Sequence, residues 1–191
     1  MKIVISGNDL STKNTLETIL KNEKYKIVAS GCDGFDIIKL CRQHNPDIVI
    51  LEKNIPLLDG ISVAQIIKSE DIAGAVVFII SEMNLELLKK IKSVDARGCV
   101  FTPIDKTQLI YTLEIASQTG KNIRELKKEK QSIEQKFEDR KAIDKAKGIL
   151  MLNENITEDE AYIRIRKYSM EKRVTMREIA EFIIVSNQFK S

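Results

Sequence analysis

Residues 47–60 read Asp-Ile-Val-Ile-Leu-Glu-Lys-Asn-Ile-Pro-Leu-Leu-Asp-Gly, and they carry the strongest fold signal in the chain. The first five form a nearly continuous apolar run after Pro46, which is typical of a strand buried on both faces in the centre of a parallel sheet. Glu52 follows directly, at the carboxyl end of that strand, where open parallel sheets place their binding sites. The stretch therefore predicts a parallel α/β domain with a candidate site at Glu52.

Strand and helix patterns alternate on both sides of this stretch. Strands are predicted at residues 2–6, 25–29, 75–80 and 98–101, and helices at 12–22, 34–44, 60–68, 85–92 and from 106 onward. On the helix at 34–44, the spacing places Phe35, Ile38 and Cys41 on one packed side. The fold class predicted for residues 1–118 is α/β, with a doubly wound five-stranded parallel sheet.

Polar residues stand where the predicted strands end. They are Asn8, Asp9, Glu52, Ser81 and Thr102, the last followed by Pro103. Together with the frame residues Pro56, Asp59 and Gly60, they resemble the site of a response-regulator receiver domain. The resemblance implies an acidic pair that binds magnesium, an aspartate that accepts a phosphoryl group, and a Ser or Thr and a Lys that sense it. It also implies a cis peptide bond between Thr102 and Pro103.

Three positions depart from that pattern. Glu52 stands in place of the aspartate, Asn8 in place of one acidic ligand, and Thr102 in place of the lysine. A glutamate carries its carboxylate one methylene further out, and the missing lysine would have paired with the phosphoryl oxygens. Loss of an acidic ligand leaves at most a weak magnesium site at Asp9 and Glu52. We therefore expect no cofactor and a pseudo-receiver that is not phosphorylated in the ordinary way.

The changed site has three interpretations, which the sequence leaves open. The domain can have drifted while being retained for its structure. Glu52 can supply a permanent negative charge that resembles the phosphorylated form. A regulatory protein bound at the receiver can control it instead.

Composition narrows the classes of function. The 191 residues are 43% hydrophobic and include three Cys without a CxxC pair and a single His, which excludes a zinc cluster built from them. No nucleophile–base pair stands out, so we do not expect an enzyme. No apolar run reaches the length of a membrane span, and we expect a cytoplasmic protein that does not contact a membrane. Residues 121–191 hold 17 Lys and Arg against 13 Asp and Glu, so this part is the better candidate for nucleic-acid contact.

A helical pattern runs from Lys106 to about Leu152 without a proline. Its apolar positions within residues 119–139 are Ile123, Leu126, Ile133 and Phe137. A lone helix with so narrow a stripe is marginal in water, whereas pairing two copies buries the stripe. We predict a coiled-coil dimerisation helix at residues 119–139 and a homodimer; packing of the stripe on the chain's own receiver is the alternative.

Residues 140–191 are predicted to form a small three-helix bundle. Thr157 and Thr175 each precede a Glu by three residues, which is the pattern of a capping box. The apolar faces are expected to contain Ile143, Ala146, Leu150, Ala161, Ile165, Tyr168, Ile179, Phe182, Ile183 and Ser186. Gly148 lies inside the first helix at a cost of about 1 kcal/mol, which close approach of RNA or of another helix would explain.

The motif Ile-Asp-Lys-Ala-Lys-Gly-Ile-Leu-Met at residues 143–151, with Ala161-Tyr162, Arg166-Lys167 and Ser169-Met170, resembles the ANTAR domain. The order of receiver, coiled coil and ANTAR resembles the amidase-operon and ethanolamine-utilisation antiterminators. The resemblance implies an RNA-binding antiterminator that binds paired stem-loops in nascent leader RNA and prevents the terminator from forming. The basic side chains available for RNA are Lys145, Lys147, Arg164, Arg166, Lys167, Arg173 and Arg177.

Two other functions compete with this one. A DNA-binding response regulator would read DNA with the last helix, residues 176–188, which offers Arg177 and Asn187 but is otherwise apolar and acidic. An adaptor would use the pseudo-receiver to bind a signalling protein, and that role is compatible with RNA binding.

Overall fold

The structure is a computed structural model that describes residues 1–7, 9–21, 23 and 25–188. The chain divides into two compact units, Met1–Glu125 and Leu126–Ser191. Helix α5 (Lys106–Glu154) contributes residues to both. Each unit is described by itself.

The first unit contains a five-stranded parallel sheet with the order β2-β1-β3-β4-β5. The strands are β1 (Lys2–Ser6), β2 (Lys26–Gly31), β3 (Ile48–Glu52), β4 (Ala75–Ile80) and β5 (Gly98–Phe101). They alternate with α1 (Leu10–Lys21), α2 (Gly34–His44), α3 (Gly60–Glu70), α4 (Leu85–Ser93) and the first part of α5. The predicted doubly wound α/β fold is confirmed.

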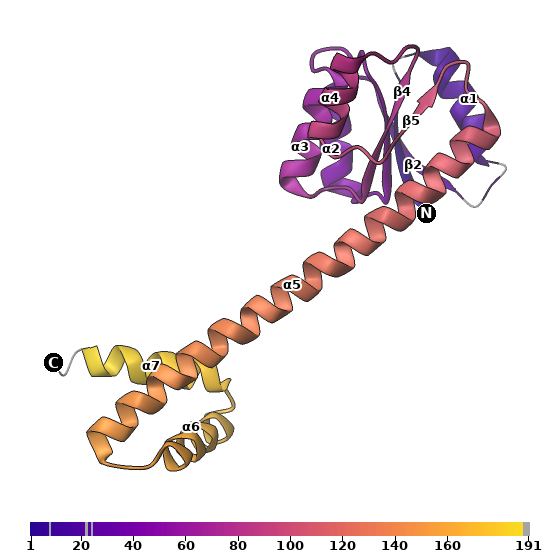
Figure 1. Cartoon of the computed structure of the whole chain (residues 1–191). Coiled ribbons are helices and arrows are strands. Elements are labelled where there is room, and N and C mark those ends of the chain that lie inside the picture. Colours follow the sequence, from indigo (N-terminus) through magenta and orange to yellow (C-terminus); the bar gives the residue numbers. More distant parts are fainter. Residues whose placement is uncertain (8, 22, 24, 189–191) are drawn as a thin grey trace. The chain divides into compact units, whose positions relative to one another are not determined.

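Helices cover both faces of the sheet (Figure 1). Because successive strand residues point to opposite faces, β3 sends Val49 and Leu51 toward α2, α3 and α4, and Ile48 and Ile50 toward α1 and α5. All four side chains are fully buried. This two-sided burial explains why the strand reads as a continuous apolar run.

One predicted helix face is wrong. Phe35 is exposed, and Ile37 is buried beside Ile38 and Cys41. The reason is the helix start: the Asp33 carboxylate accepts from the Asp36 amide at 2.9 Å and caps α2, which places Phe35 in the first turn. The side chains that reach the sheet therefore begin two residues later.

The loop after β3 folds back onto the end of its own strand. The Gly60 amide donates to the Lys53 carbonyl at 2.9 Å, and a Cβ at Gly60 would lie 2.2 Å from the Glu52 carbonyl oxygen. Asp59 then caps α3 by accepting from the Ser62 amide at 2.9 Å. The Asp-Gly pair seven residues after Glu52 is therefore a structural requirement of this loop.

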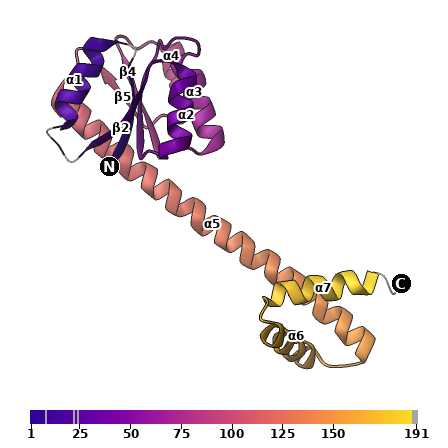
Figure 2. The same ribbon diagram turned by 180° about the vertical axis from the view of Figure 1, so that it is seen from behind.

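The second unit contains the last part of α5 with α6 (Glu158–Lys172) and α7 (Met176–Gln188), which flank it in Figure 2. Asn155 and Arg173, both with positive φ, end α5 and α6. Both predicted capping boxes are present: Glu160 and Glu178 accept from the amides of Thr157 and Thr175. The three-helix bundle is confirmed.

The bundle core differs from the prediction at two aromatic positions. Its buried side chains are Ala146, Leu150, Ala161, Ile165 and Ala180. Phe182 is 70% exposed and Tyr168 is 43% exposed. Small alanines on all three helices let the helices approach closely, which leaves no room for aromatic rings between them.

Among the described residues, none of the helices combines the length and apolarity that a membrane span requires.

Candidate functional site

The carboxyl edge of the sheet gathers the described receiver-site residues into one pocket. Asp9, Glu52, Ser81 and Thr102 all line it, from four different strand ends. Asn8 lies outside the described residues. The peptide bond between Thr102 and Pro103 is cis, as the resemblance implies.

Glu52 is held in place by Ser6. The buried Ser6 hydroxyl donates to Glu52 Oε1 at 3.3 Å and accepts from the Glu52 amide at 2.9 Å. Burial raises the pKa of Glu52 above its usual range, and the Asp9 charge adds to this, while hydrogen bonds from Ser6 and the Asp9 amide oppose it. The carboxylate is therefore partly desolvated, and among the described residues no salt bridge offsets that cost.

Asp9 has a structural task. Its carboxylate accepts from the Thr12 hydroxyl at 2.6 Å and from the amides of Thr12 and Ser11 at 3.0 and 3.2 Å. These bonds cap the start of α1 and lower the pKa of Asp9, the Thr12 hydroxyl contributing most. Both carboxylate oxygens are thus engaged by the protein itself.

The pocket suits phosphoryl transfer poorly. Among the described residues lining it, Lys53 is the one cation, against the carboxylates of Asp9, Glu52 and Glu82. Thr102 supplies no charge to neutralise phosphoryl oxygens. In the described part of the chain, no three His, Cys, Asp or Glu side chains converge as a group that could hold a metal. With Asp9 occupied as a cap, these residues do not fit the magnesium ion that the receiver pattern implies.

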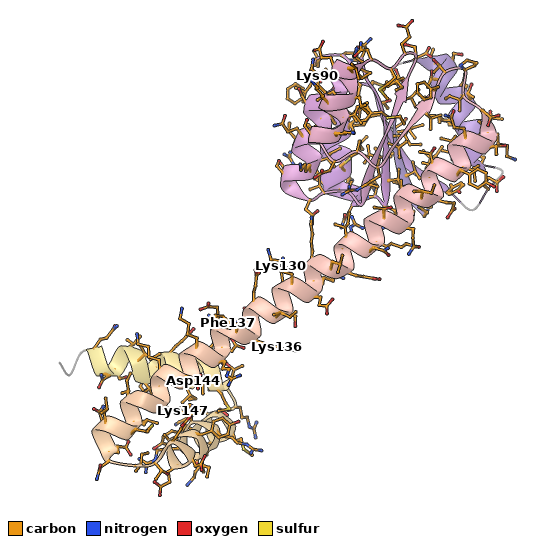
Figure 3. The ribbon with its side chains drawn as sticks, viewed as in Figure 1. Lys90, Lys130, Lys136, Phe137, Asp144 and Lys147 are labelled. Carbon is orange, nitrogen blue, oxygen red and sulfur yellow. The ribbon has the colours of Figure 1, made fainter. Side chains whose placement is uncertain are left out.

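The second unit holds the basic residues predicted for RNA, and several of them are paired. Lys147 contacts Asp144 at 2.6 Å and Glu158 at 2.7 Å, which raises its pKa (Figure 3). Arg177 contacts Asp139 at 3.0 Å and Glu181 at 2.7 Å. Arg164 pairs with Glu154, and Lys167 lies 3.8 Å from Glu171.

Three predicted cations have no carboxylate partner within the part of the chain that the structure describes: Lys145, Arg166 and Arg173. All three are exposed. Arg166 lies on α6, and Arg173 is its C-terminal cap in a left-handed conformation at φ 55°. These side chains can meet a phosphate or a base without first breaking an internal ion pair.

The apolar stripe of α5 is largely uncovered. Leu126, Ile133 and Phe137 are each more than half exposed, and Figure 3 shows Phe137 with Lys130 and Lys136 along this part of the helix. Lys130 lies within the stripe and contacts Glu134 at 3.5 Å. Exposed apolar side chains in a regular row are an interaction surface in need of a partner.

Sequence reasoning missed three features. Ser6 is the partner of Glu52, although a serine at the end of the first strand gave no distinctive signal. The Asp9 cap could have been found, because an Asp shortly before a predicted helix is a preferred N-cap residue. The third feature is apolar surface on α6 and α7, including a groove lined by Tyr168, Val174 and Phe182.

Comparison with known proteins agrees with the division of the chain into two units. Residues 3–114 match the response regulator receiver domain family, and residues 131–184 match the ANTAR domain family. The transcriptional regulatory protein PdtaR of Mycobacterium tuberculosis is 29% identical over 183 residues, covering 96% of this chain and 89% of that protein. The transcriptional regulatory protein DegU of Brevibacillus brevis is 21% identical over 120 residues, covering 62% of this chain and 50% of that protein.

Solved structures resemble the first unit. A signal receiver domain of a modulated diguanylate cyclase from Desulfovibrio desulfuricans has a TM-score of 0.58 at 21% identity, covering 63% of this chain and 95% of that one. The chemotaxis protein CheY4 of Vibrio cholerae has a TM-score of 0.56 at 18% identity, covering 60% of this chain and 97% of that one. The family match covers more than half of the chain, and the chain belongs to the response regulators, with a receiver domain followed by an ANTAR domain.

Proposed function

We propose that this chain is an RNA-binding transcription antiterminator that binds paired stem-loops in nascent leader RNA. The observation that carries the proposal is the ANTAR match over residues 131–184, which coincides with the three-helix bundle that holds the exposed cations Lys145, Arg166 and Arg173. Similarity along nearly the full length of a transcriptional regulatory protein supports the regulatory role. The protein acts by binding and catalyses no reaction.

The receiver acts as a pseudo-receiver in this proposal. Phosphorylation is disfavoured by three features together: the hydrogen bond from Ser6 to the Glu52 carboxylate, the capping role of Asp9 and the uncharged Thr102. Control therefore comes from the fixed charge of Glu52 or from a regulatory protein bound at this domain. Incubation with a small phosphodonor should leave the intact mass unchanged, and a stoichiometric phosphoryl adduct would overturn this part.

Dimerisation through the α5 stripe completes the proposal. We divide the chain into a receiver at residues 1–118, a coiled-coil helix at 119–139 and an ANTAR bundle at 140–191. The exposure of Leu126, Ile133 and Phe137 supports pairing of two copies. A dimer presents two bundles, and once one stem-loop is bound, the second contact becomes intramolecular.

The proposal of RNA binding is tested by selection from an RNA pool, followed by a mobility-shift assay. A pool of RNAs carrying two stem-loops with randomised loop bases is passed over the full-length protein, and the enriched RNA is compared with duplex DNA of the same sequence at moderate salt. We expect enrichment, and tight binding of RNA alone. A failure to enrich any RNA, or equal affinity for the two nucleic acids, would overturn the proposal. Preference for the duplex would favour the DNA-binding alternative.

A further inference from the structure

The outward face of α6 carries apolar and aromatic side chains that the bundle does not use. Tyr162, Ile163 and Met170 are 43%, 62% and 69% exposed. A neighbouring face of the same helix buries Ala161, Ile165 and Ser169. With 3.6 residues per turn, Tyr162, Ile163, Arg166 and Met170 fall on adjacent turns of the outward side. We call these four residues the α6 strip.

The strip is cationic as well as apolar. Arg166 lies in its middle, and its guanidinium makes no ion pair among the described residues. Arg173 follows the strip at the end of α6. Asp159 lies on the same side one turn before Tyr162, so the positive charge belongs to the part from Tyr162 onward. The surface therefore favours an anion that also has flat apolar faces.

Arg173 has a second peculiarity. It occupies a left-handed position at φ 55°, where helix ends favour glycine because other residues are strained there. An arginine at this position gives up stability that a glycine would supply. Its exposed charge lies at this end of the strip.

From these observations we propose that the α6 strip recognises an unpaired base in an RNA loop. Tyr162 stacks on the base, Arg166 lies against it or reads its edge, and Ile163 and Met170 cover its apolar faces. Unpaired loop bases are the part of an RNA that proteins read by stacking on aromatic rings and guanidinium planes. This inference rests on the proposed RNA-binding function and adds the residues that give it loop specificity.

The same geometry assigns a different role to the paired cations. Lys147, Arg164 and Arg177 each already contact a carboxylate of another helix, which is Glu158, Glu154 or Asp139 respectively. Using any of them for RNA would expose that carboxylate to the phosphate backbone. They are positioning residues that join the helices, and the base-reading surface lies on α6.

The test uses the enriched RNA with four variants of the full-length protein. Tyr162→Ala and Arg166→Lys should each lower affinity about tenfold or more, the size expected for loss of one stacked base. Arg166→Lys keeps its charge, so the dependence of affinity on salt should stay as in the natural protein. Tyr162→Phe keeps the ring and should bind normally. Lys136→Ala removes an exposed cation from α5 and should change affinity less than twofold.

A second readout separates base contact from folding. With 2-aminopurine in place of a loop adenine, stacking by Tyr162 should quench its fluorescence, and Tyr162→Ala should abolish the change. Both altered side chains are exposed, so circular dichroism should match the natural protein. Normal affinity of Tyr162→Ala and Arg166→Lys, with RNA still preferred over DNA, would overturn this inference alone. Absence of RNA binding by the natural protein would overturn it together with the proposed function.

Discussion

Replacing Gly148 by alanine should stabilise the second unit. Gly148 lies inside α5, and a Cβ built there meets no atom within 4 Å. Glycine inside a helix costs about 1 kcal/mol relative to alanine, because its backbone loses more freedom on folding. The substitution should recover about that amount, since no atom of the described residues opposes the added methyl group.

Gly120 is the matched control, because it lies in the same helix under opposite conditions. A Cβ at Gly120 would lie 2.6 Å from the Gly74 carbonyl oxygen and 3.1 Å from its carbon. The helix-propensity gain would be the same, but the contact is with backbone and cannot relax cheaply. Gly120→Ala should therefore destabilise the first unit by about 1–3 kcal/mol, the usual range for overpacking.

The assay is native-state amide hydrogen exchange on the full-length protein. In Gly148→Ala, the amides of residues 142–152 should exchange about fivefold more slowly, which corresponds to about 1 kcal/mol of local stability. Exchange in the first unit should stay unchanged. Faster exchange near residue 148 would refute the reasoning, because it would mean that a second copy or another partner closes on this glycine in solution.

Three further changes test other parts of the structure. Glu52→Gln should raise the thermal midpoint of the receiver at pH 7, because the raised pKa of Glu52 means that folding disfavours its charged form. This gain in the midpoint should shrink as the pH falls through the pKa of Glu52. A lower midpoint at pH 7 would contradict the prediction. Thr157→Ala removes the hydroxyl that accepts from the Glu160 amide, the side-chain half of the capping box, and should cost the second unit about 1 kcal/mol in urea unfolding, whereas an unchanged midpoint would show that the cap is dispensable. Ile133→Asp places a charge in the α5 stripe and should shift sedimentation from dimer to monomer; a natural protein that is already monomeric at micromolar concentration would remove the coiled coil from the proposal.

The fold could be predicted because its signals are local and repeated. Apolar runs, a Pro-to-Gly loop and two Thr-x-x-Glu capping boxes each report on a few neighbouring residues, and the structure contains all of them. Errors arose where packing decides which side of a helix is buried. Spacing alone predicts that Phe35 and Phe182 lie on apolar faces, but a helix cap and close-packed alanines leave both exposed.

The candidate sites were predictable in position but not in the state of their side chains. The strand ends identified Asp9, Glu52, Ser81 and Thr102, and the pocket brings these four together. The sequence can suggest Asp9 as a helix cap, but it could not show that both carboxylate oxygens are engaged by α1, because that depends on backbone geometry. Nor could it separate paired from unpaired cations in the bundle, since partners such as Asp139 and Arg177 are 38 residues apart.

That last pair links the two proposed activities of the second unit. Asp139 follows the stripe residue Phe137 on α5, and its carboxylate is bound by Gln135 and by Arg177 of α7, which together lower its pKa. The turn of α5 that ends the stripe is thus tied to the bundle. Because a helix is stiff over such short distances, pairing of two stripes in the proposed dimer would also set how the two bundles are oriented. Ile133→Asp should therefore weaken binding to a two-stem-loop RNA far more than to a single stem-loop. Equal losses of affinity for both RNAs would contradict the claim that dimerisation contributes to RNA recognition.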